Sequence, residues 1–219
     1  GAAALLTNSS GANNTAIGRS ALRFNTTASN NTAVGYQAGY SNTTGASNLF
    51  AGTYAGYHTT TGTDNTYVGN SAGPNVSSST GSYNTAIGRA ALVSNTTASS
   101  NTAVGYQAGY SNSTGANLVA MGESALRSNT TGTSNTAIGP AAVYSNTTGN
   151  YNTGIGQQAL NNNTTANYNT AVGYQAGYAN TTGYDNTFVG AYSGDAITTG
   201  PQNTGLGYNA GGNLTTGAN

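Results

Sequence analysis

The sequence repeats one pattern of residues every 17 positions along its whole length. The pattern centres on Asn-Thr-Ala-(Val/Ile)-Gly and is clearest from Asn31 to Ser47. Its closing glycine, called the anchor glycine below, recurs at Gly18, Gly35, Gly52, Gly69, Gly88, Gly105, Gly122, Gly139, Gly156, Gly173, Gly190 and Gly207. A fixed period of this length is typical of a solenoid, in which each repeat forms one coil stacked on its neighbours.

The repeats form a single array over residues 1–219, with about thirteen coils. The interval from Gly69 to Gly88 is two residues longer than the others, and the residues near 74–80 predict an enlarged loop there. The array starts and stops in phase, at Gly1 and Asn219, without a capping segment. Because solenoid ends need caps to stay soluble, we expect a fragment of a longer chain.

The composition of each repeat excludes helices and favours short strands between turns. Every repeat contains at least one glycine, several β-branched residues, and Asn and Thr residues that compete for helical hydrogen bonds. We therefore predict an all-β fold, a stacked β-solenoid that is either a β-roll or a triple β-helix. Like residues of adjacent coils would lie about 4.8 Å apart along its axis.

The asparagine that opens the pattern predicts a structural ladder, because stacked Asn amides bond to one another and to turn backbones. The ladder consists of Asn14, Asn31, Asn48, Asn65, Asn84, Asn101, Asn135, Asn152, Asn169, Asn186 and Asn203. One repeat has Leu118 at this position, so we expect the ladder to break or shift there.

The predicted strand Thr-Ala-(Val/Ile) has two consecutive apolar residues, which point to opposite faces of a strand. A lone solenoid has one dry interior, so the second apolar face requires another chain. The thin core of Ala and Val side chains also requires another chain. We therefore predict that the chain binds itself in an intertwined homo-oligomer, a homotrimer, with lateral assembly as a further form of self-association.

The charge pattern excludes two classes of partner. The eight charged residues give zero net charge and are Arg19, Arg23, Arg89, Arg127, Asp64, Glu123, Asp185 and Asp195. Nucleic acids require a basic surface, and membrane surfaces require a basic amphipathic helix. No stretch reaches the roughly 18 apolar residues of a membrane span. We expect neither nucleic-acid binding nor membrane insertion by this segment.

No group of residues indicates an enzyme, a metal site or a cofactor site. The single histidine, His58, lies in a variable stretch with no partners for a triad or a metal cluster. Asp64 and Asp185 occupy equivalent positions many coils apart, too far to form a catalytic carboxylate pair. We therefore expect no catalytic, metal or cofactor-binding residues.

Tyrosines are the best candidates for surface recognition. Six of them lie one or five places after an anchor glycine: Tyr36, Tyr40, Tyr106, Tyr110, Tyr174 and Tyr178. Exposed rings of this kind would stack on sugars, which makes a carbohydrate or host-surface receptor a candidate partner. In the alternative interpretation the rings pack against neighbouring coils or chains, with their hydroxyl groups in water.

The repeat itself resembles sequences of a known kind. The strings Asn-Thr-Ala-Val-Gly-Tyr-Gln-Ala-Gly-Tyr-Ser-Asn-Thr-Thr-Gly, at Asn31 to Gly45, and Asn-Thr-Ala-Ile-Gly resemble the tandem repeats of bacterial surface and phage tail-fibre-like proteins. They are similar, more loosely, to the head repeats of trimeric autotransporter adhesins, which form a left-handed β-roll but have a shorter unit. The resemblance implies an extended trimeric fibre that is extracellular, on a cell surface or a virion.

The leading hypothesis is a structural component of an extracellular fibre or adhesin, a rigid rod that presents a repetitive polar surface. One alternative is an ice-binding solenoid with two threonine ladders, represented by Thr15, Thr32, Thr66, Thr85 and Thr102 and by Thr26, Thr43, Thr60 and Thr96. Another alternative is a matrix or sheath subunit that assembles laterally through its Tyr and Thr faces.

Overall fold

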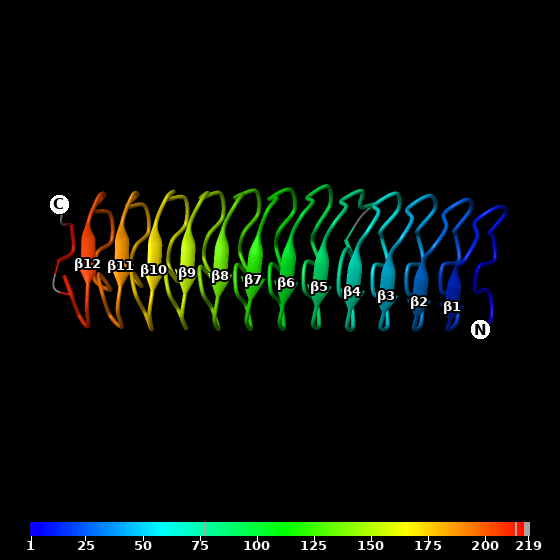
Figure 1. Ribbon diagram of the computed structural model, residues 1–219, viewed down its shortest axis with the longest axis horizontal. Coiled ribbons are helices and arrows are strands. Elements are labelled where there is room, and N and C mark those ends of the chain that lie inside the picture. The colour runs from blue at the N-terminus through cyan, green and yellow to red at the C-terminus, as the bar shows by residue number, and fades with distance from the viewer. Residues whose placement is uncertain (77, 213, 217–219) are drawn as a thin grey trace. The chain divides into compact units, whose positions relative to one another are not determined.

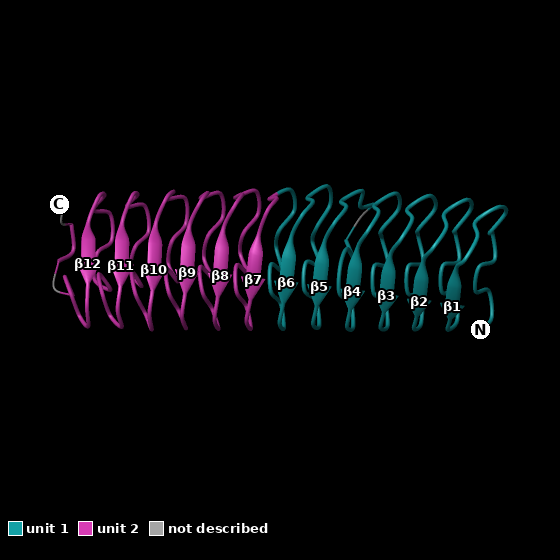
Figure 2. Cartoon of the chain, viewed as in Figure 1, with its two compact units in different colours: residues 1–114 teal, residues 115–219 magenta. Residues whose placement is uncertain are grey.

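The computed structural model describes residues 1–76, 78–212 and 214–216. The chain forms two compact units, residues 1–114 (unit 1) and residues 115–219 (unit 2), which are coloured separately in Figure 2. Both units are all-β, and within each unit the strands follow one another in chain order (Figure 1). The prediction of a β-solenoid with repeats of about 17 residues is confirmed.

Each strand is three residues long and begins at the Thr position of the pattern. Unit 1 contains β1 (Thr15–Ile17), β2 (Thr32–Val34), β3 (Leu49–Ala51), β4 (Thr66–Val68), β5 (Thr85–Ile87) and β6 (Thr102–Val104). Unit 2 contains β7 (Val119–Met121), β8 (Thr136–Ile138), β9 (Thr153–Ile155), β10 (Thr170–Val172), β11 (Thr187–Val189) and β12 (Thr204–Leu206). Neighbouring strands within a unit are parallel and in register, so Thr15 pairs with Thr32 and Ile17 with Val34. Like residues therefore form columns along each unit.

The turns of each coil are also hydrogen-bonded to the next coil. The Gly39 N–H donates to the Ala55 carbonyl at 2.8 Å, and the Thr43 N–H donates to the Thr60 carbonyl at 2.9 Å. Backbone groups of adjacent coils thus satisfy one another outside the strands as well. The side of the coil opposite the strand is consequently built from stacked turns.

The anchor glycines are required both by backbone conformation and by space. Gly35 has a φ of 142°, which side-chain-bearing residues rarely adopt. A Cβ atom on Gly35 would lie 2.4 Å from the carbonyl oxygen of Gly52, the anchor glycine of the next coil. The same contact recurs at other anchor glycines, for example at Gly18 and Gly190, so a coil that is covered by the next coil needs glycine at this position.

Three further positions of the coil have positive φ: the second and fourth residues after the anchor glycine and the residue before the ladder asparagine. In one coil these are Gln37 (52°), Gly39 (60°) and Ser47 (59°). The left-handed conformation costs a residue with a side chain about 1–2 kcal/mol. Leu22 adopts it at 48°, where its side chain is fully buried and its N–H donates to the Ala38 carbonyl at 3.0 Å.

Two positions of the coil share the space in the core: the fourth residue after the anchor glycine and the centre of the following strand. Where the fourth residue after the anchor glycine is Leu22, the centre of the following strand is the small residue Ala33, and both are buried. Where that residue is Gly39, the strand centre is Phe50. A Cβ atom on Gly39 or on Gly56 would lie 2.5 or 2.3 Å from the Phe50 ring, so one ring fills the space above two glycines. The aromatic strand centres are Phe50, Tyr67 and Phe188.

The long repeat takes up its two extra residues in a turn. The Asn48 side-chain amide donates to the Gly62 carbonyl, 14 residues ahead, whereas the Asn65 amide donates to Gly81, 16 residues ahead. The Asn75 N–H still donates to the next coil, at the Val93 carbonyl. The extra residues therefore lie between Asn75 and Gly81, and the columns resume afterwards.

Candidate functional surfaces

The predicted ladder asparagines lie immediately before the strands. Their side chains form hydrogen bonds that join adjacent coils. In unit 1 the Asn31 side-chain amide donates to the Gly45 carbonyl at 2.9 Å. The Asn31 Oδ1 atom accepts the backbone N–H of Asn48, the next ladder residue, also at 2.9 Å. Unit 2 repeats these contacts, for example from Asn152 to the Ala166 carbonyl. Leu118, which replaces asparagine before β7, is buried.

A second column of buried asparagines, seven places after the anchor glycine, was not foreseen from the sequence. It includes Asn25, Asn42, Asn95, Asn112, Asn129, Asn146, Asn163 and Asn180, all fully buried. The Asn42 side-chain amide donates to the Asn25 Oδ1 atom at 3.2 Å. The signal was present in the recurring Asn-Thr-Thr triplet, for example at Asn42 and Asn146.

The two asparagine columns meet at one carbonyl group. The side-chain amides of Asn31 and Asn42 both donate to the Gly45 carbonyl at 2.9 Å. In unit 2 the amides of Asn135 and Asn146 converge on the Gly149 carbonyl in the same way. A buried hydrogen bond contributes about 1 kcal/mol net, and leaving such a group unpaired costs more. Both columns therefore hold the coils together from inside, and neither faces a ligand.

The first outward surface is the strand face, formed by the first and third residues of each strand. The third residues form what we call the apolar column, which in unit 1 is Ile17, Val34, Ala51, Val68, Ile87 and Val104 and in unit 2 is Met121, Ile138, Ile155, Val172, Val189 and Leu206. Ile17 is 59% exposed and Val34 is 41% exposed, although both are large hydrophobic residues. A column of Thr side chains runs beside it.

The two threonine ladders differ in what their hydroxyl groups bind. In the second ladder the Thr26 hydroxyl donates to the Thr43 carbonyl, and the Thr43 hydroxyl donates to the Thr60 carbonyl, both at 3.1 Å. On the strand face, the hydroxyls of residues such as Thr32 and Thr85 make no hydrogen bond to the part of the chain that the structure describes. Only the strand-face ladder therefore has hydroxyls free for water.

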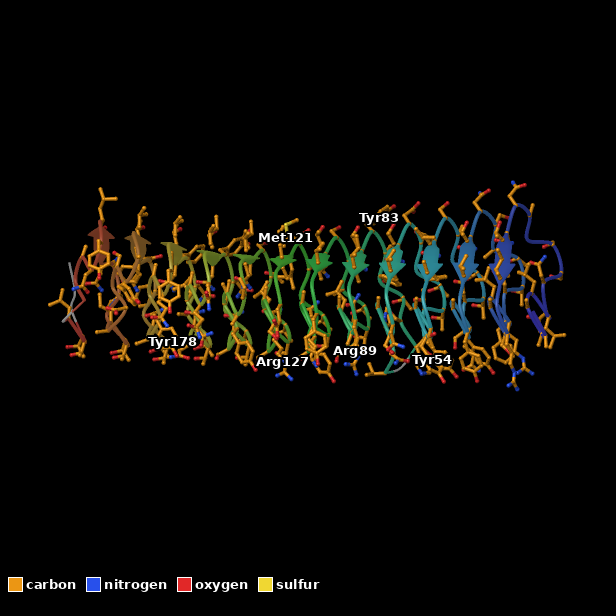
Figure 3. All side chains as sticks on the ribbon, turned by 90° about the horizontal axis from the view of Figure 1, so that it is seen from below. Tyr54, Tyr83, Arg89, Met121, Arg127 and Tyr178 are labelled. Atoms are coloured by element: carbon orange, nitrogen blue, oxygen red, sulfur yellow. The ribbon has the colours of Figure 1, made fainter. Side chains whose placement is uncertain are left out.

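The second outward surface is the aromatic face, formed by the first, second, fifth and sixth residues after each anchor glycine. Figure 3 shows Tyr54 and Arg89 of unit 1 on the side away from the strands, and likewise Arg127 and Tyr178 of unit 2. The residues of this face come from stacked turns, so equivalent side chains of adjacent coils lie next to one another.

In unit 1 the aromatic face contains a continuous ring cluster. Tyr36 and Tyr54 pack edge to face at 5.3 Å between centroids, and Tyr54 packs edge to face with Tyr57 at 5.6 Å. Tyr57 stacks on Tyr40 at 4.9 Å with 12° between the ring planes. Burial raises the pKa of Tyr57, and the neighbouring tyrosines raise it further. Ring pairs of this kind add about 0.5–1.5 kcal/mol beyond burial.

The six predicted recognition tyrosines divide by position. Those directly after an anchor glycine, Tyr36, Tyr106 and Tyr174, are 37%, 41% and 40% exposed. Those at the fifth position, Tyr40, Tyr110 and Tyr178, are half-buried. Ring faces at the first position are thus the more accessible to a ligand.

Arginines accompany several of these rings, which sequence reasoning missed. The Arg19 guanidinium lies 6.0 Å from the Tyr36 ring centroid, and Arg89 lies 5.7 Å from that of Tyr106. Arg23 lies 5.8 Å from Tyr40 and donates to its hydroxyl at 3.4 Å. The signal was an arginine 17 residues before a tyrosine.

The histidine and the carboxylates do not assemble into a reactive group. His58 packs edge-on against Tyr57 at 4.6 Å, and its burial lowers the pKa of the imidazole. Over residues 1–76, 78–212 and 214–216 there is no cluster of His, Asp or Glu able to hold a metal ion. No pocket is found in the described structure, and no helix there is long and apolar enough to cross a membrane.

Comparisons with known protein families, with curated proteins and with solved structures found no match to the chain.

Proposed function

We propose that the chain is a structural segment of an extracellular fibre or adhesin, on a cell surface or a virion, in which three copies associate through their strand faces. The apolar column is the observation that carries this proposal. Each square ångström of apolar surface left in water forgoes about 25 cal/mol of stabilisation. Contact between chains recovers that free energy, because it removes the exposed Ile and Val side chains from water.

Another copy of the same chain is the best occupant for this face. Its apolar column has the same spacing of about 4.8 Å per coil, so two columns stay in step over many coils. Zero net charge removes long-range repulsion between copies. Three copies around one axis bury all three columns in a closed arrangement. The resemblance of the repeats to trimeric adhesin heads favours three copies over two.

The molar mass in solution, measured by light scattering, tests the association. We expect three times the chain mass of 21.6 kDa for the native sequence. The double variant Val34→Glu/Ile87→Glu places charges on the apolar column and is expected to give single chains with an unchanged β-type circular dichroism spectrum. The matched control Thr27→Glu/Thr44→Glu alters exposed turn residues and should leave the mass unchanged.

Two results would contradict the trimer. One is a single-chain mass for the native sequence at about 100 µM, where a specific interface of standard size is occupied. The other is a trimeric mass for Val34→Glu/Ile87→Glu. A mass that grows without limit would instead favour a sheath subunit that assembles laterally.

Ice binding is a second candidate, which the free hydroxyls of the strand-face threonines favour. Thr and Ile or Val alternate on this face at regular spacing, while the hydroxyls of the second ladder are occupied by the backbone. The same face cannot bind ice and be buried in a trimer. Thermal hysteresis in the native chain, lost in Thr85→Tyr but not in Thr44→Val, would support ice binding, and no hysteresis would eliminate it.

A further inference from the structure

Unit 1 carries its positively and negatively charged side chains on different sides of the coil. Its three arginines, Arg19, Arg23 and Arg89, all lie on the aromatic face, and its single carboxylate is Asp64. Asp64 belongs to the column of Tyr83, which Figure 3 shows on the strand side. Within the described residues of unit 1, the three guanidinium groups have no carboxylate partner. The aromatic face of unit 1 is therefore cationic although the chain is neutral.

Two of these arginines form equivalent pairs with exposed tyrosines. Arg19 and Arg89 are both exposed, and each lies over the tyrosine one coil further on, Tyr36 and Tyr106 respectively. A guanidinium that stacks on a ring keeps its N–H groups at the edge, where they fit a carboxylate in a two-point contact. The accessible part of the ring face can pack against the C–H groups of a sugar.

The repetition of the pair indicates a polymeric ligand. Four coils separate Arg19 from Arg89, which corresponds to about 19 Å at 4.8 Å per coil. A single polymer chain running along the coils would reach both pairs, and linking two weak contacts in this way raises the overall affinity. With three arginines and no lysine, the surface is too weakly basic for the dense charge of a nucleic acid.

We propose that the Arg19–Tyr36 and Arg89–Tyr106 pairs are two equivalent subsites for a carboxylated polysaccharide. Each guanidinium binds a sugar carboxylate, and each tyrosine packs against the sugar ring. This ligand extends the proposed adhesin role. It does not require the trimer, because the aromatic face lies away from the strands.

The chain contains its own natural comparison for this arrangement. Tyr174 occupies the same position in unit 2, but the residue 17 places earlier is Gln157 instead of arginine. Unit 2 also has carboxylates at the first and fifth positions of its aromatic face, Glu123 and Asp195. We therefore expect Tyr174 to contribute little to the binding of an acidic polymer.

Binding of polygalacturonate to the full 219-residue chain, measured by calorimetry at low salt, tests the proposal. The variant Arg19→Gln/Arg89→Gln reproduces the glutamine of unit 2 and should weaken binding by about tenfold or more, since it removes two charge-assisted contacts. The gain-of-function variant Gln157→Arg creates a third pair and should strengthen binding. Arg127→Gln removes an arginine from unit 2 and should have an effect below about twofold.

Further measurements separate the sugar contact from general attraction to anions. Tyr36→Ala/Tyr106→Ala should weaken binding of polygalacturonate but not of polyphosphate, whereas Tyr174→Ala should change neither. Fully methyl-esterified polygalacturonate, which lacks the charge, should bind much more weakly than the acid. Circular dichroism of each variant checks that the coils remain folded.

Three outcomes would overturn the proposal: no binding of polygalacturonate, equal binding of the methyl ester, or unchanged affinity in Arg19→Gln/Arg89→Gln. A sugar-binding site would also be rejected if Tyr36→Ala/Tyr106→Ala weakened the binding of polyphosphate as much as that of polygalacturonate. The light-scattering mass is measured on the same samples, so failure of polysaccharide binding is distinguished from failure of the trimer.

Discussion

At the scale of single residues, asparagine suits the ladder positions because its short side chain has both a hydrogen-bond donor and an acceptor. Asn31 donates to the Gly45 carbonyl and accepts from the Asn48 N–H within one buried column. Aspartate would bring an oxygen against the carbonyl and a charge into the interior, and glutamine would be one methylene too long. The ladders therefore explain a composition rich in asparagine without any reference to ligands.

Tyr67 provides a test of polar satisfaction in the core. Its ring is fully buried at the centre of β4, and its hydroxyl lies beside the Asn84 side chain without forming a hydrogen bond of ordinary geometry to any described residue. At equivalent positions the chain has Phe50 and Phe188. We expect Tyr67→Phe to leave the free energy of unfolding unchanged or to raise it by about 1 kcal/mol, because an unpaired buried hydroxyl is removed.

The same variant predicts a change in alkaline stability. Burial raises the pKa of Tyr67 above its ordinary value of 10.0, since the charged phenolate is disfavoured inside the protein. Above pH 10 the unfolded chain loses this proton while the folded chain keeps it, so stability falls as the pH rises. Tyr67→Phe should lose less stability than the native chain between about pH 9 and pH 11.

Denaturant titrations of both proteins at several pH values measure this difference. The exposed residue Tyr151 gives the control, since Tyr151→Phe should unfold like the native chain at each pH. A loss of more than about 1 kcal/mol in Tyr67→Phe at neutral pH would mean that its hydroxyl is hydrogen-bonded after all.

At the scale of the coil, the sequence predicts the strand side better than the turn side. The strand positions follow from the fixed period and from the alternation of side chains around Ala33. The left-handed positions carry residues as different as Gln37, Leu22 and Ser47, so no residue type marks them. Hydrogen bonds to adjacent coils impose this conformation, and a pattern within one coil cannot reveal it.

The candidate surfaces were predictable to a similar, limited extent. The period places Tyr36, Tyr106 and Tyr174 in one column, but their exposure depends on how the turns stack. The pairing of Arg19 with Tyr36 needed the knowledge that side chains 17 residues apart are neighbours on the turn side. The outward apolar column was expected from two consecutive apolar residues in the strand.

The exchange of volume in the core predicts a compensating pair of substitutions. Phe188→Ala alone should cost about 3–5 kcal/mol, because it empties the space above two glycines. Gly177→Leu alone should also destabilise, since its new Cβ atom would lie 2.8 Å from the Phe188 ring. Together they recreate the Leu160 and Ala171 pair of the preceding coil. We therefore expect the double variant to be about 2 kcal/mol more stable than the sum of the two single-variant changes in unfolding free energy predicts.

A double-mutant cycle from denaturant titrations measures this coupling. Phe188→Ala combined with the exposed Thr148→Ala provides the additive control. Additive effects in Gly177→Leu/Phe188→Ala would show that the two positions do not share one space. Full recovery is not expected, because Gly194 also lies under the Phe188 ring.

At the scale of the molecule, each unit has two outward surfaces with different chemistry. The strand face is apolar and hydroxyl-bearing, while the aromatic face carries tyrosines and, in unit 1, all the positive charge. A fibre whose chains associate through one surface keeps the other accessible. The proposed self-association and the proposed ligand binding can therefore change independently, by substitution in different columns.

The columns also predict which deletions the molecule tolerates. Removing Gly156–Val172 takes out one whole coil. Asn186 then follows Asn152 directly in the asparagine ladder, and all other positions of the repeat stay in phase. We expect the β-type circular dichroism spectrum to persist, with a modest drop in melting temperature from the loss of one coil interface. Removing only Gly156–Asn163 puts glycine columns out of register and should abolish folding of unit 2.

Thermal unfolding followed by circular dichroism compares the two deletions. The prediction is wrong if the whole-coil deletion unfolds the chain, or if the eight-residue deletion melts like it.

The left-handed residues of the turn side have a consequence for folding kinetics. A single coil would have to hold Leu22 or Val143 in a conformation costing about 1–2 kcal/mol each, without the adjacent coil that supplies their hydrogen bonds. The first pair of coils is therefore an unfavourable nucleus, and each later coil adds to a template that already fixes its backbone. Folding should spread from such a nucleus one coil at a time, and a proline or bulky residue at an anchor glycine should halt it at that coil.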